Sequence, residues 1–411
     1  MVMVKSFRGL RYNPEKVGSL DSALAPPYDV ISPRERDELY EKNPYNVVRV
    51  ILAKGSNDGK YEAAGRAFSE WIKGGVLIEE DVPSIYPFYQ QFDDAGDGGK
   101  GITRKGFIAV LKIEDFESKL VLPHEKTFAK PKEDRLKLTK ACNANLSPVF
   151  TVYSDPEGGL EGSIDDAISS LDPVIDVSGE DGVVSRLWRV SDPGVLDTIT
   201  TSLAERTLLI ADGHHRYETA VNFRDIKRAE SGGADAGEAE YVMVFLARAE
   251  GEGLVIKPTH RVVKSLGPLT VEELLDRVES RFAISRIPID RAEDSMGHEE
   301  FCIYTRGGDF LYKLSPKYLE GEPFESIAVF KLHKQLLGTH VSDDEGSVAY
   351  TKSFSEALDM VKSGEYEAAF LLPNLRAMDI LSVVSAGEKM PHKSTYFYPK
   401  ILSGLVFHRL G

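Results

Sequence analysis

The sequence predicts a mixed α/β fold, and three observations support that prediction. The apolar run 208–211 has the length of a buried strand, and after Asp212-Gly213 the apolar residues follow a helical spacing. In the C-terminal third, helix-like and strand-like segments alternate, although too irregularly to assign a doubly wound sheet. The chain has 411 residues, which is long enough for two or three domains with cores of their own.

Composition limits the classes of function. The formal net charge is −15, which argues against non-specific binding of nucleic acid. No apolar run is long enough for a membrane helix, and the start of the sequence does not resemble a signal peptide. The two cysteines, Cys142 and Cys302, are too few for a disulfide framework and are expected to be buried thiols. We therefore expect a cytoplasmic protein without nucleic-acid or membrane partners, and its oligomeric state stays open.

A loop stiffened by prolines opens the N-terminal part. The prolines between residues 25 and 33 exclude a helix there, whereas Ser32-Pro33 is a typical helix start. Tyr28 and Asp29 lie inside this loop. They belong either to a rigid surface turn or to a loop whose polar groups face a site.

Local patterns predict further elements. In the first half we expect a strand over 46–53, a helix over 59–73, a hairpin of the runs 85–92 and 102–112, a helix over 133–142 and a strand over 147–153. In the second half we expect a hairpin of 241–248 and 254–257, helices over 271–282, 324–337, 354–361 and 376–385, and strands over 301–305 and 368–372.

Two short motifs contain residues that could bind an anion or act as a base. Asp212-Gly-His-His-Arg216 places two imidazoles and a guanidinium at a helix N-terminus, where free N–H groups favour an anion. The simpler interpretation, an aspartate cap with solvated histidines, fits a lone Asp-Gly better than it fits this box. His124-Glu125 is weak evidence by itself, but it precedes a basic segment. Beside cations, the Glu125 carboxylate can stay ionised and act as a base next to bound phosphate.

Two C-terminal segments are weaker candidates. His260-Arg261 is expected just past a strand end, where loops often carry function, although a surface pair is an equal alternative. The loop before the last aromatic run contains His392, Lys393, Ser394 and Thr395. That loop either holds a phosphate or small substrate or is simply solvated.

These motifs carry a resemblance to known families. Asp212-Gly-His-His-Arg216 resembles the central box of the ParB/sulfiredoxin-like fold, which binds nucleotide phosphates. The segments 123–125, 212–216 and 391–395 resemble, in the same order, motifs of the archaeal free serine kinases. Nearly the whole chain resembles the domain of unknown function 1015 family, through the segments 25–29, 124–127, 145–148, 212–216 and 258–261.

The resemblance implies a domain organisation. It predicts an N-terminal α/β region over 1–115, a ParB/sulfiredoxin-like core over 116–265 and a C-terminal α/β lobe over 266–411. The N-terminal region and the long segment between Glu125 and Asp212 depart from the archaeal kinase, so the phosphate donor is open among ADP, ATP and pyrophosphate.

The resemblance also implies a reaction and roles for residues. A kinase would transfer a phosphoryl group to the hydroxyl of free L-serine, giving O-phosphoserine, with Mg²⁺ assisting. Glu125 would be the general base, and Asp212 would orient the hydroxyl or the metal. The other implied roles are phosphate binding by Gly213, His214, His215, Arg216, His392, Lys393, Ser394 and Thr395, and substrate binding by His124, His260, Arg261, Tyr28 and Asp29.

Two other classes of function remain as alternatives. A nucleotide-binding ParB-like regulatory module would lack catalysis, but the acidic chain shows no basic helix-turn-helix. A metal-dependent phosphohydrolase would use His214 and His215 with a distant carboxylate. The sequence has no tight ligand spacing such as His-Glu-x-x-His, so this class ranks third.

Overall fold

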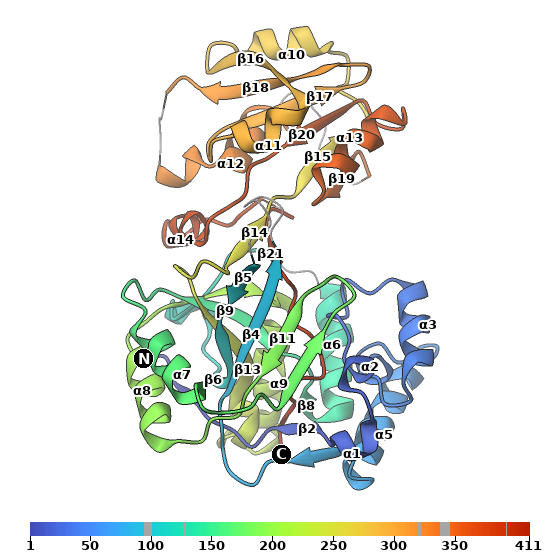
Figure 1. Ribbon diagram of the computed structural model, residues 1–411, viewed down its shortest axis with the longest axis vertical. Helices are drawn as coiled ribbons and strands as arrows, with labels where there is room; N and C mark the ends of the chain where they lie inside the picture. The colour runs from blue at the N-terminus through green and yellow to red at the C-terminus, as the bar shows by residue number, and fades with distance from the viewer. Residues whose placement is uncertain (94–100, 126–128, 319–321, 338–345, 392) are drawn as a thin grey trace. The chain divides into compact units, whose positions relative to one another are not determined.

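The computed structural model describes residues 1–93, 101–125, 129–318, 322–337, 346–391 and 393–411. Its contacts divide the chain into two compact units (Figure 1). Unit 1 contains the described residues of 1–254 and 399–411, and unit 2 contains those of 255–398. In sequence, unit 2 is therefore inserted into unit 1. The three-part division expected from the sequence stays a prediction, although its first two parts contribute strands to one sheet here.

A ten-stranded mixed sheet forms the centre of unit 1. Its main path runs β10-β11-β4-β6-β13-β9-β12-β7, with β1 paired to β6 and β5 paired to β4. The pairs β13/β9 and β12/β7 are parallel, and the other pairs are antiparallel. The strands of this sheet are β1 Val4–Lys5, β4 Tyr86–Asp93, β5 Gly101–Arg104, β6 Gly106–Lys112, β7 Val121–Pro123, β9 Val149–Tyr153, β10 Ile175–Ser178, β11 Val184–Leu187, β12 Leu208–Asp212 and β13 Tyr241–Arg248.

Helices flank this sheet. Figure 1 shows α7 and α8 on one side of unit 1 and α3 and α5 on the other. Helix α6 packs on α5 and α9. The helices are α1 Pro14–Val17, α2 Leu20–Ala23, α3 Pro33–Lys42, α4 Val48–Ile51, α5 Gly59–Lys73, α6 Ala129–Cys142, α7 Gly159–Ile168, α8 Pro193–Leu203 and α9 His214–Glu230. Two small ribbons complete the unit: β2 Leu10–Tyr12 with β3 Leu77–Glu79, and β8 Ala144–Asn145 with β22 His408–Arg409.

The four central strands β6, β9, β12 and β13 are buried along almost their whole length. Such continuous apolar runs are typical of strands that are covered on both faces. Strand β12 ends at Asp212, and α9 begins two residues later at His214. The strand–glycine–helix order predicted from the sequence is thus confirmed, and a rigid sheet carries the residues of the box.

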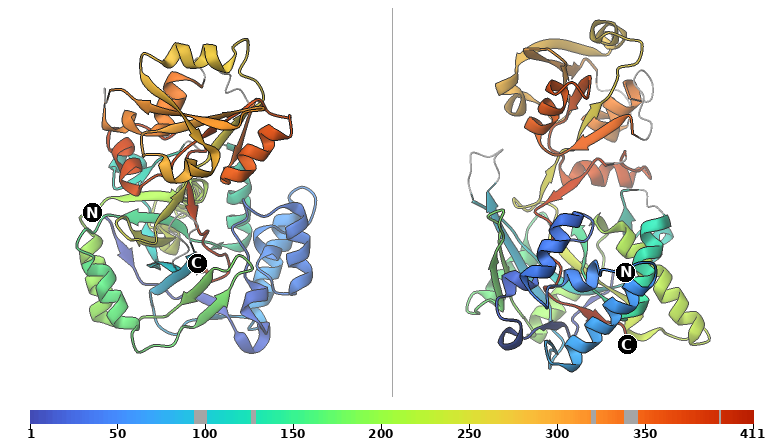
Figure 2. Two further views of the ribbon diagram at one scale, coloured as in Figure 1. Left: turned by 45° about the horizontal axis from the view of Figure 1, so that its top comes forward. Right: turned by 90° about the vertical axis from the view of Figure 1, so that its right-hand side faces the viewer.

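Unit 2 has an antiparallel sheet in the order β16-β18-β17-β20-β15-β19. Helix α13 packs on this sheet through β15 and β20, and Figure 2 gives two further views of the unit. A separate ribbon pairs β14 Val255–Lys257 with β21 Tyr396–Tyr398. The other elements are β15 His260–Val263, β16 Phe282–Pro288, β17 Phe301–Thr305, β18 Phe310–Pro316, β19 Val348–Thr351, β20 Ala368–Leu371, α10 Val271–Val278, α11 Ala292–Ser295, α12 Ala328–Gln335, α13 Phe354–Lys362 and α14 Ala377–Ser385.

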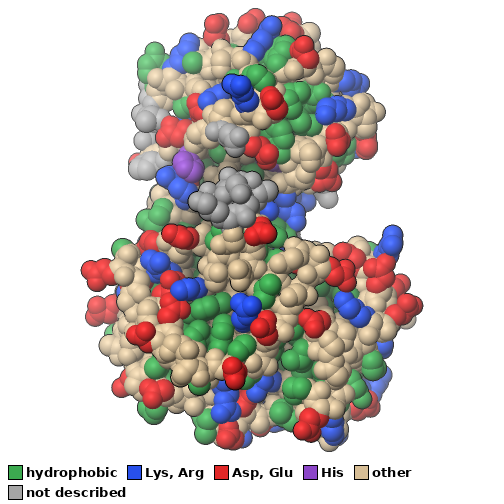
Figure 3. Space-filling model, in the orientation of Figure 1, with side chains coloured by type: hydrophobic (Ala, Val, Ile, Leu, Met, Phe, Trp, Pro, Cys, Tyr) green, Lys and Arg blue, Asp and Glu red, His purple; other side chains and the backbone are tan. Residues whose placement is uncertain are grey.

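A mixed α/β fold is therefore confirmed, and most local predictions agree with it. Helix α3 begins at Pro33, where Ser32 and Glu35 form a capping box. Both cysteines are buried free thiols. Among the described residues, no helix is long and apolar enough to cross a membrane. The face drawn in Figure 3 shows acidic and basic side chains interspersed on both units.

The strand predicted over 46–53 is wrong, because Val48–Ile51 forms the short helix α4. The buried side chain of Asn46 explains the difference. Its Oδ1 accepts from the Val48 N–H at 2.9 Å, and its Nδ2 donates to the carbonyls of Ser22 and Leu24. This side chain caps a helical turn and fixes it against α2, so tertiary contacts override the β-branched run.

The hairpin predicted for 241–257 is also wrong. Strand β13 already has β6 and β9 on its two sides, so no edge is left for β14. The chain turns away instead, and β14 pairs with β21 about 140 residues later. The helix predicted over 271–282 ends at Val278, and that over 324–337 is confined to α12 after a 3₁₀ turn.

Candidate active site

The turn between β12 and α9 needs glycine. Gly213 has φ of +92°, a region that L-residues rarely adopt. A Cβ on Gly213 would lie 2.8 Å from Nε of Arg216. The turn therefore brings the Arg216 guanidinium back over the backbone at the start of α9.

We expect Gly213→Ala to lower the free energy of unfolding by about 1–2 kcal/mol from backbone strain alone. The added contact with Arg216 should increase that loss. Gly232→Ala is the matched control, because Gly232 has φ of +71° and no atom lies within 4 Å of the place that a Cβ would take. Urea denaturation of both variants measures the difference. Equal losses would contradict the close packing of Arg216 on Gly213.

Asp212 lies between two cations. Its Oδ2 is 3.3 Å from Nη2 of Arg216 and 3.3 Å from Nζ of Lys400. Burial by itself raises the pKa of Asp212, but Lys400 and then Arg216 and His214 outweigh burial and hold the pKa well below its usual range. Asp212 is therefore an ionised carboxylate in a cationic setting.

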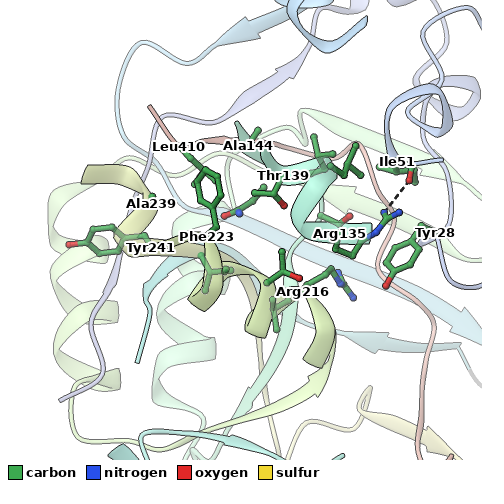
Figure 4. A pocket seen from close by; sticks show the side chains of 18 residues that line it. Tyr28, Ile51, Arg135, Thr139, Ala144, Arg216, Phe223, Ala239, Tyr241 and Leu410 are labelled. Atoms are coloured by element: carbon green, nitrogen blue, oxygen red, sulfur yellow. Dashed lines mark hydrogen bonds between the residues drawn. The ribbon is translucent and has the colours of Figure 1, made fainter. Parts of the chain in front are cut away.

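Arg216 is directed inward. Its Nη1 donates to the carbonyl of Pro148, and the side chain is 14% exposed. Together with Tyr28 and Arg135, Arg216 lines a cavity of about 50 Å³ between α6 and α9, shown in Figure 4. The buried Oγ1 of Thr219, also in this lining, has no hydrogen-bond partner within the described part of the chain. A cavity of this size holds a few waters, not a nucleobase.

The predicted base lies beside two histidines. The oxygens of Glu125 are 3.9 Å from Nε2 of His124 and from Nδ1 of His214. The imidazoles of the two histidines meet edge to face, with centroids 4.6 Å apart. The structure thus brings Glu125 to the start of α9, and its side chain keeps 31% of its surface exposed.

Hydrogen bonds assign the tautomers of these histidines. Nδ1 of His124 lies 2.6 Å from the carbonyl of Ile210 and so carries a proton. The backbone N–H of His124 donates to Nε2 of His214 at 3.2 Å. In its neutral form His214 therefore holds its proton on Nδ1, the nitrogen that faces Glu125. Burial lowers the pKa of His124 to about 4, so that ring is neutral at pH 7.

Loop residues from the N-terminal part approach the same region. The Tyr28 ring lies 4.0 Å from the guanidinium carbon of Arg135, and burial raises the pKa of the Tyr28 hydroxyl. Burial lowers the pKa of His215, and the negative charges of Glu218, Glu125 and Asp29 partly offset this effect. Tyr28 and Asp29 are thus placed near the box, although their role in substrate binding stays a prediction.

Two residues whose charges act on Asp212, Lys400 and Arg104, carry no signal in the sequence. Lys400 contacts Asp212 directly, as described above. Arg104 is only 2% exposed, and its Nη2 donates to Gln90 and to the carbonyl of Pro399. Burial lowers the pKa of Arg104, and the charge of Asp212 counters that effect. No local pattern marks these residues, because each stands alone in a strand or loop.

Unit 2 gathers other predicted site residues. His260 and Arg261 lie within β15, not past a strand end, and both are buried, so neither forms a surface pair. Nη2 of Arg261 donates to Oγ of Ser394 at 3.1 Å. Lys393 has φ of +50°, and its Nζ lies 4.7 Å from the ring centroid of Tyr350. Thr395 directly precedes β21, whereas His392 lies outside the described residues. Their binding roles stay predictions.

His260 predicts a dependence of stability on pH. Burial, reinforced by the charge of Arg261, lowers the pKa of His260 to about 4. An unfolded histidine titrates near 6.5, so between pH 6.5 and 4 only the unfolded state takes up this proton. The free energy of unfolding should fall with decreasing pH there, by up to about 1.4 kcal/mol per unit.

His260→Asn should remove that contribution. The Asn Oδ1 can still accept from the Leu372 N–H, which now donates to Nδ1 of His260 at 3.1 Å. Urea denaturation from pH 7 to 4 should therefore give a shallower slope for the variant. Identical slopes would mean that His260 is not held neutral.

The predicted role of Mg²⁺ stays a prediction, and Asp212 is the residue that would contact it. Among the described residues, no group of three or more His, Cys, Asp or Glu forms a ready metal site. Mg²⁺ on a polyphosphate needs only one or two protein carboxylates, since phosphate oxygens and water supply the other ligands. Asp212, with 22% of its side chain exposed, can serve in that way.

Comparison with known proteins identifies one family. A family described as "Protein of unknown function (DUF1015)" matches residues 4–336. No curated protein matches significantly.

Solved structures resemble the chain only distantly. A free serine kinase in complex with AMP is 14% identical, with 67% of this chain and 83% of that chain covered and a TM-score of 0.33. SbnI with a C-terminal truncation from Staphylococcus aureus is 13% identical, with 72% and 85% covered and a TM-score of 0.37. A conserved hypothetical protein from Pyrococcus furiosus is 13% identical, with 69% and 89% covered and a TM-score of 0.31.

Proposed function

Because the chain belongs to the DUF1015 family, whose description assigns no activity, we propose a function from the site in unit 1: a small-molecule kinase. The donor is a polyphosphate (ADP, ATP or pyrophosphate), and the acceptor is the hydroxyl of free L-serine. One observation carries the proposal. A carboxylate, Glu125, lies beside the N-terminus of α9, where cationic and N–H groups favour phosphate.

The proposed reaction is an in-line phosphoryl transfer. Glu125 accepts the hydroxyl proton while the serine oxygen bonds to the terminal phosphorus and the bond to the leaving phosphate breaks. Partial exposure of the Glu125 side chain suits a base that must meet a substrate hydroxyl. Nδ1 of His214 lies 3.9 Å from the same carboxylate.

The start of α9 would stabilise the phosphates. Its first N–H groups, together with His214, His215 and Arg216, would offset charge on the transferring and leaving groups. Gly213 permits the close approach of the backbone. Mg²⁺, when bound, would be held by Asp212 and would neutralise charge on the donor oxygens.

The acceptor is the less constrained part of this proposal. Arg261 has 0% exposure, and its side chain bonds to the carbonyl of Thr259 and to Ser394. Its predicted role in substrate binding therefore carries no weight in this proposal. The phosphate chemistry of unit 1 does not depend on it.

The test is direct. The protein is incubated with L-serine, Mg²⁺ and, separately, ADP, ATP or pyrophosphate, and O-phosphoserine is followed by ³¹P NMR. Formation of phosphoserine with one donor supports the proposal and identifies the donor. Release of inorganic phosphate without serine would instead indicate a phosphohydrolase. Nucleotide binding without turnover of any donor would indicate a regulatory module.

A further inference from the structure

Lys400 reaches the site from a distant part of the sequence. It lies in the segment 399–411, which returns to unit 1 after unit 2. Its Nζ is 3.3 Å from Oδ2 of Asp212, and its side chain is only 13% exposed. Its positive charge also acts on His124. Lys400 is therefore a nearly buried cation at the start of α9, outside every motif recognised in the sequence.

Two buried side chains hold the backbone of this segment. Nη2 of Arg104 donates to the Pro399 carbonyl at 2.6 Å, and Nε2 of Gln90 donates to the Lys400 carbonyl at 3.2 Å. Arg104 and Gln90 also bond to each other, and neither is more than 2% exposed. The guanidinium of Arg104 lies over the ring of Phe150, the sheet partner of Asp212. Arg104 and Gln90 thus hold the backbone of the segment that carries Lys400.

Buried cations gather near Asp212. Arg216 and Lys400 contact this carboxylate, the charge of Asp212 also acts on Arg104, and none of the three cations is more than 14% exposed. Nε and Nη1 of Arg104 are buried and have no hydrogen-bond partner within the described part of the chain. A buried guanidinium whose N–H groups have no acceptor is costly, so an anion close to Arg104 is favoured. A helix N-terminus next to this cluster adds to the preference for an anion.

We infer that Lys400 binds the phosphate of the donor and that Arg104 and Gln90 position it for this contact. In the free protein Asp212 holds the ammonium. When the donor binds, the ammonium is shared with a phosphate oxygen. This inference rests on the proposed function, because it assigns the donor to the start of α9.

The test measures binding without catalysis. Pyrophosphate and ADP are titrated separately into the full-length protein by calorimetry, with no serine present. Loss of one charge-assisted hydrogen bond should weaken the binding of both by about 10- to 100-fold in Lys400→Met. Lys400→Arg, which keeps the charge, should stay within about 3-fold of the parent. Lys105→Met is the control, because Lys105 forms an ion pair with Asp165 at 2.7 Å and does not contact Asp212.

A second comparison tests whether Arg104 and Gln90 position Lys400. Arg104→Lys keeps the charge but cannot hold both Gln90 and the Pro399 carbonyl, so it should weaken pyrophosphate binding. In the Lys400→Met background the same change should have little further effect, since there is no ammonium left to position. An equal loss in both backgrounds would show that Arg104 acts independently of Lys400.

The outcomes separate this inference from the proposed function. A parent protein that binds neither pyrophosphate nor ADP overturns the inference, and the proposed function falls with it if ATP also gives no phosphoserine. A parent that makes phosphoserine, with a Lys400→Met variant of parental affinity, overturns only the role of Lys400. If Lys400→Met does not fold, Lys400→Gln, which retains a polar end for Asp212, replaces it with the same expected loss.

Discussion

Glu125→Gln should lower kcat for phosphoserine formation by about 10²–10⁴-fold, the usual contribution of a general base. Glutamine keeps the size and polarity of the side chain, but it cannot take up the hydroxyl proton. Donor affinity should change little, because Glu125 lies 3.9 Å from His124 and His214 and is not one of the cations that bind phosphate. Initial rates at saturating serine and donor measure the effect.

A second carboxylate provides the control for this prediction. Glu161 forms an ion pair with Arg248 at 3.4 Å and is 21% exposed, so Glu161→Gln removes a similar charge from unit 1. It should leave kcat within about 2-fold of the parent. A Glu125→Gln enzyme with parental turnover would end the base assignment even if the phosphate site survived.

Asp212→Asn should cause the largest loss of stability, about 3 kcal/mol, because it leaves buried cations without their carboxylate. Lys400, Arg216 and Arg104 would then repel one another at the start of α9. Urea denaturation at pH 7 measures the loss. Pyrophosphate should restore more stability to this variant than to the parent, since the anion would take over part of the role of Asp212.

The control for Asp212 is an exposed ion pair. Asp176 contacts Arg186 at 3.1 Å, and its side chain is 50% exposed. Asp176→Asn should therefore change the free energy of unfolding by less than about 1 kcal/mol. If Asp212→Asn also changed the free energy of unfolding by less than about 1 kcal/mol, groups other than this carboxylate would have to compensate the nearby cations.

Local signals explain which parts of the fold were predictable. The helix start at Ser32-Pro33 and the Asp212-Gly213 turn are predictable because the deciding residues are adjacent in sequence. The run 46–53 looks like a strand because its β-branched residues are the only local signal. The helix α4 depends instead on the Asn46 side chain, which is held by residues 22 and 24, more than twenty positions away in the sequence. The partner of β14 lies farther away still.

The site residues also divide into those with a local sequence signal and those without one. The motifs at 124–125 and 212–216 were recognised because several chemically useful residues are adjacent in sequence, and the fold places Glu125 next to His214. Arg104, Gln90 and Lys400 carry no such signal. A lone arginine in a strand is usually solvated, and only the pairing of β4 with β5 and the return of the chain at Pro399 bury it.

The two-stranded ribbon of β14 and β21, where the chain enters and leaves unit 2, has a practical consequence. Val255 and Tyr398 are paired residues of β14 and β21, so the first and last residues of the insertion are neighbours. The residues before Val255 and after Tyr398 can therefore be joined by a two-residue Asn-Gly turn in place of unit 2, because the two chain ends already lie close together. Such a shortened polypeptide would keep every residue from Tyr28 to Lys400 that surrounds the start of α9, and it would show whether phosphate recognition is a property of the host domain alone.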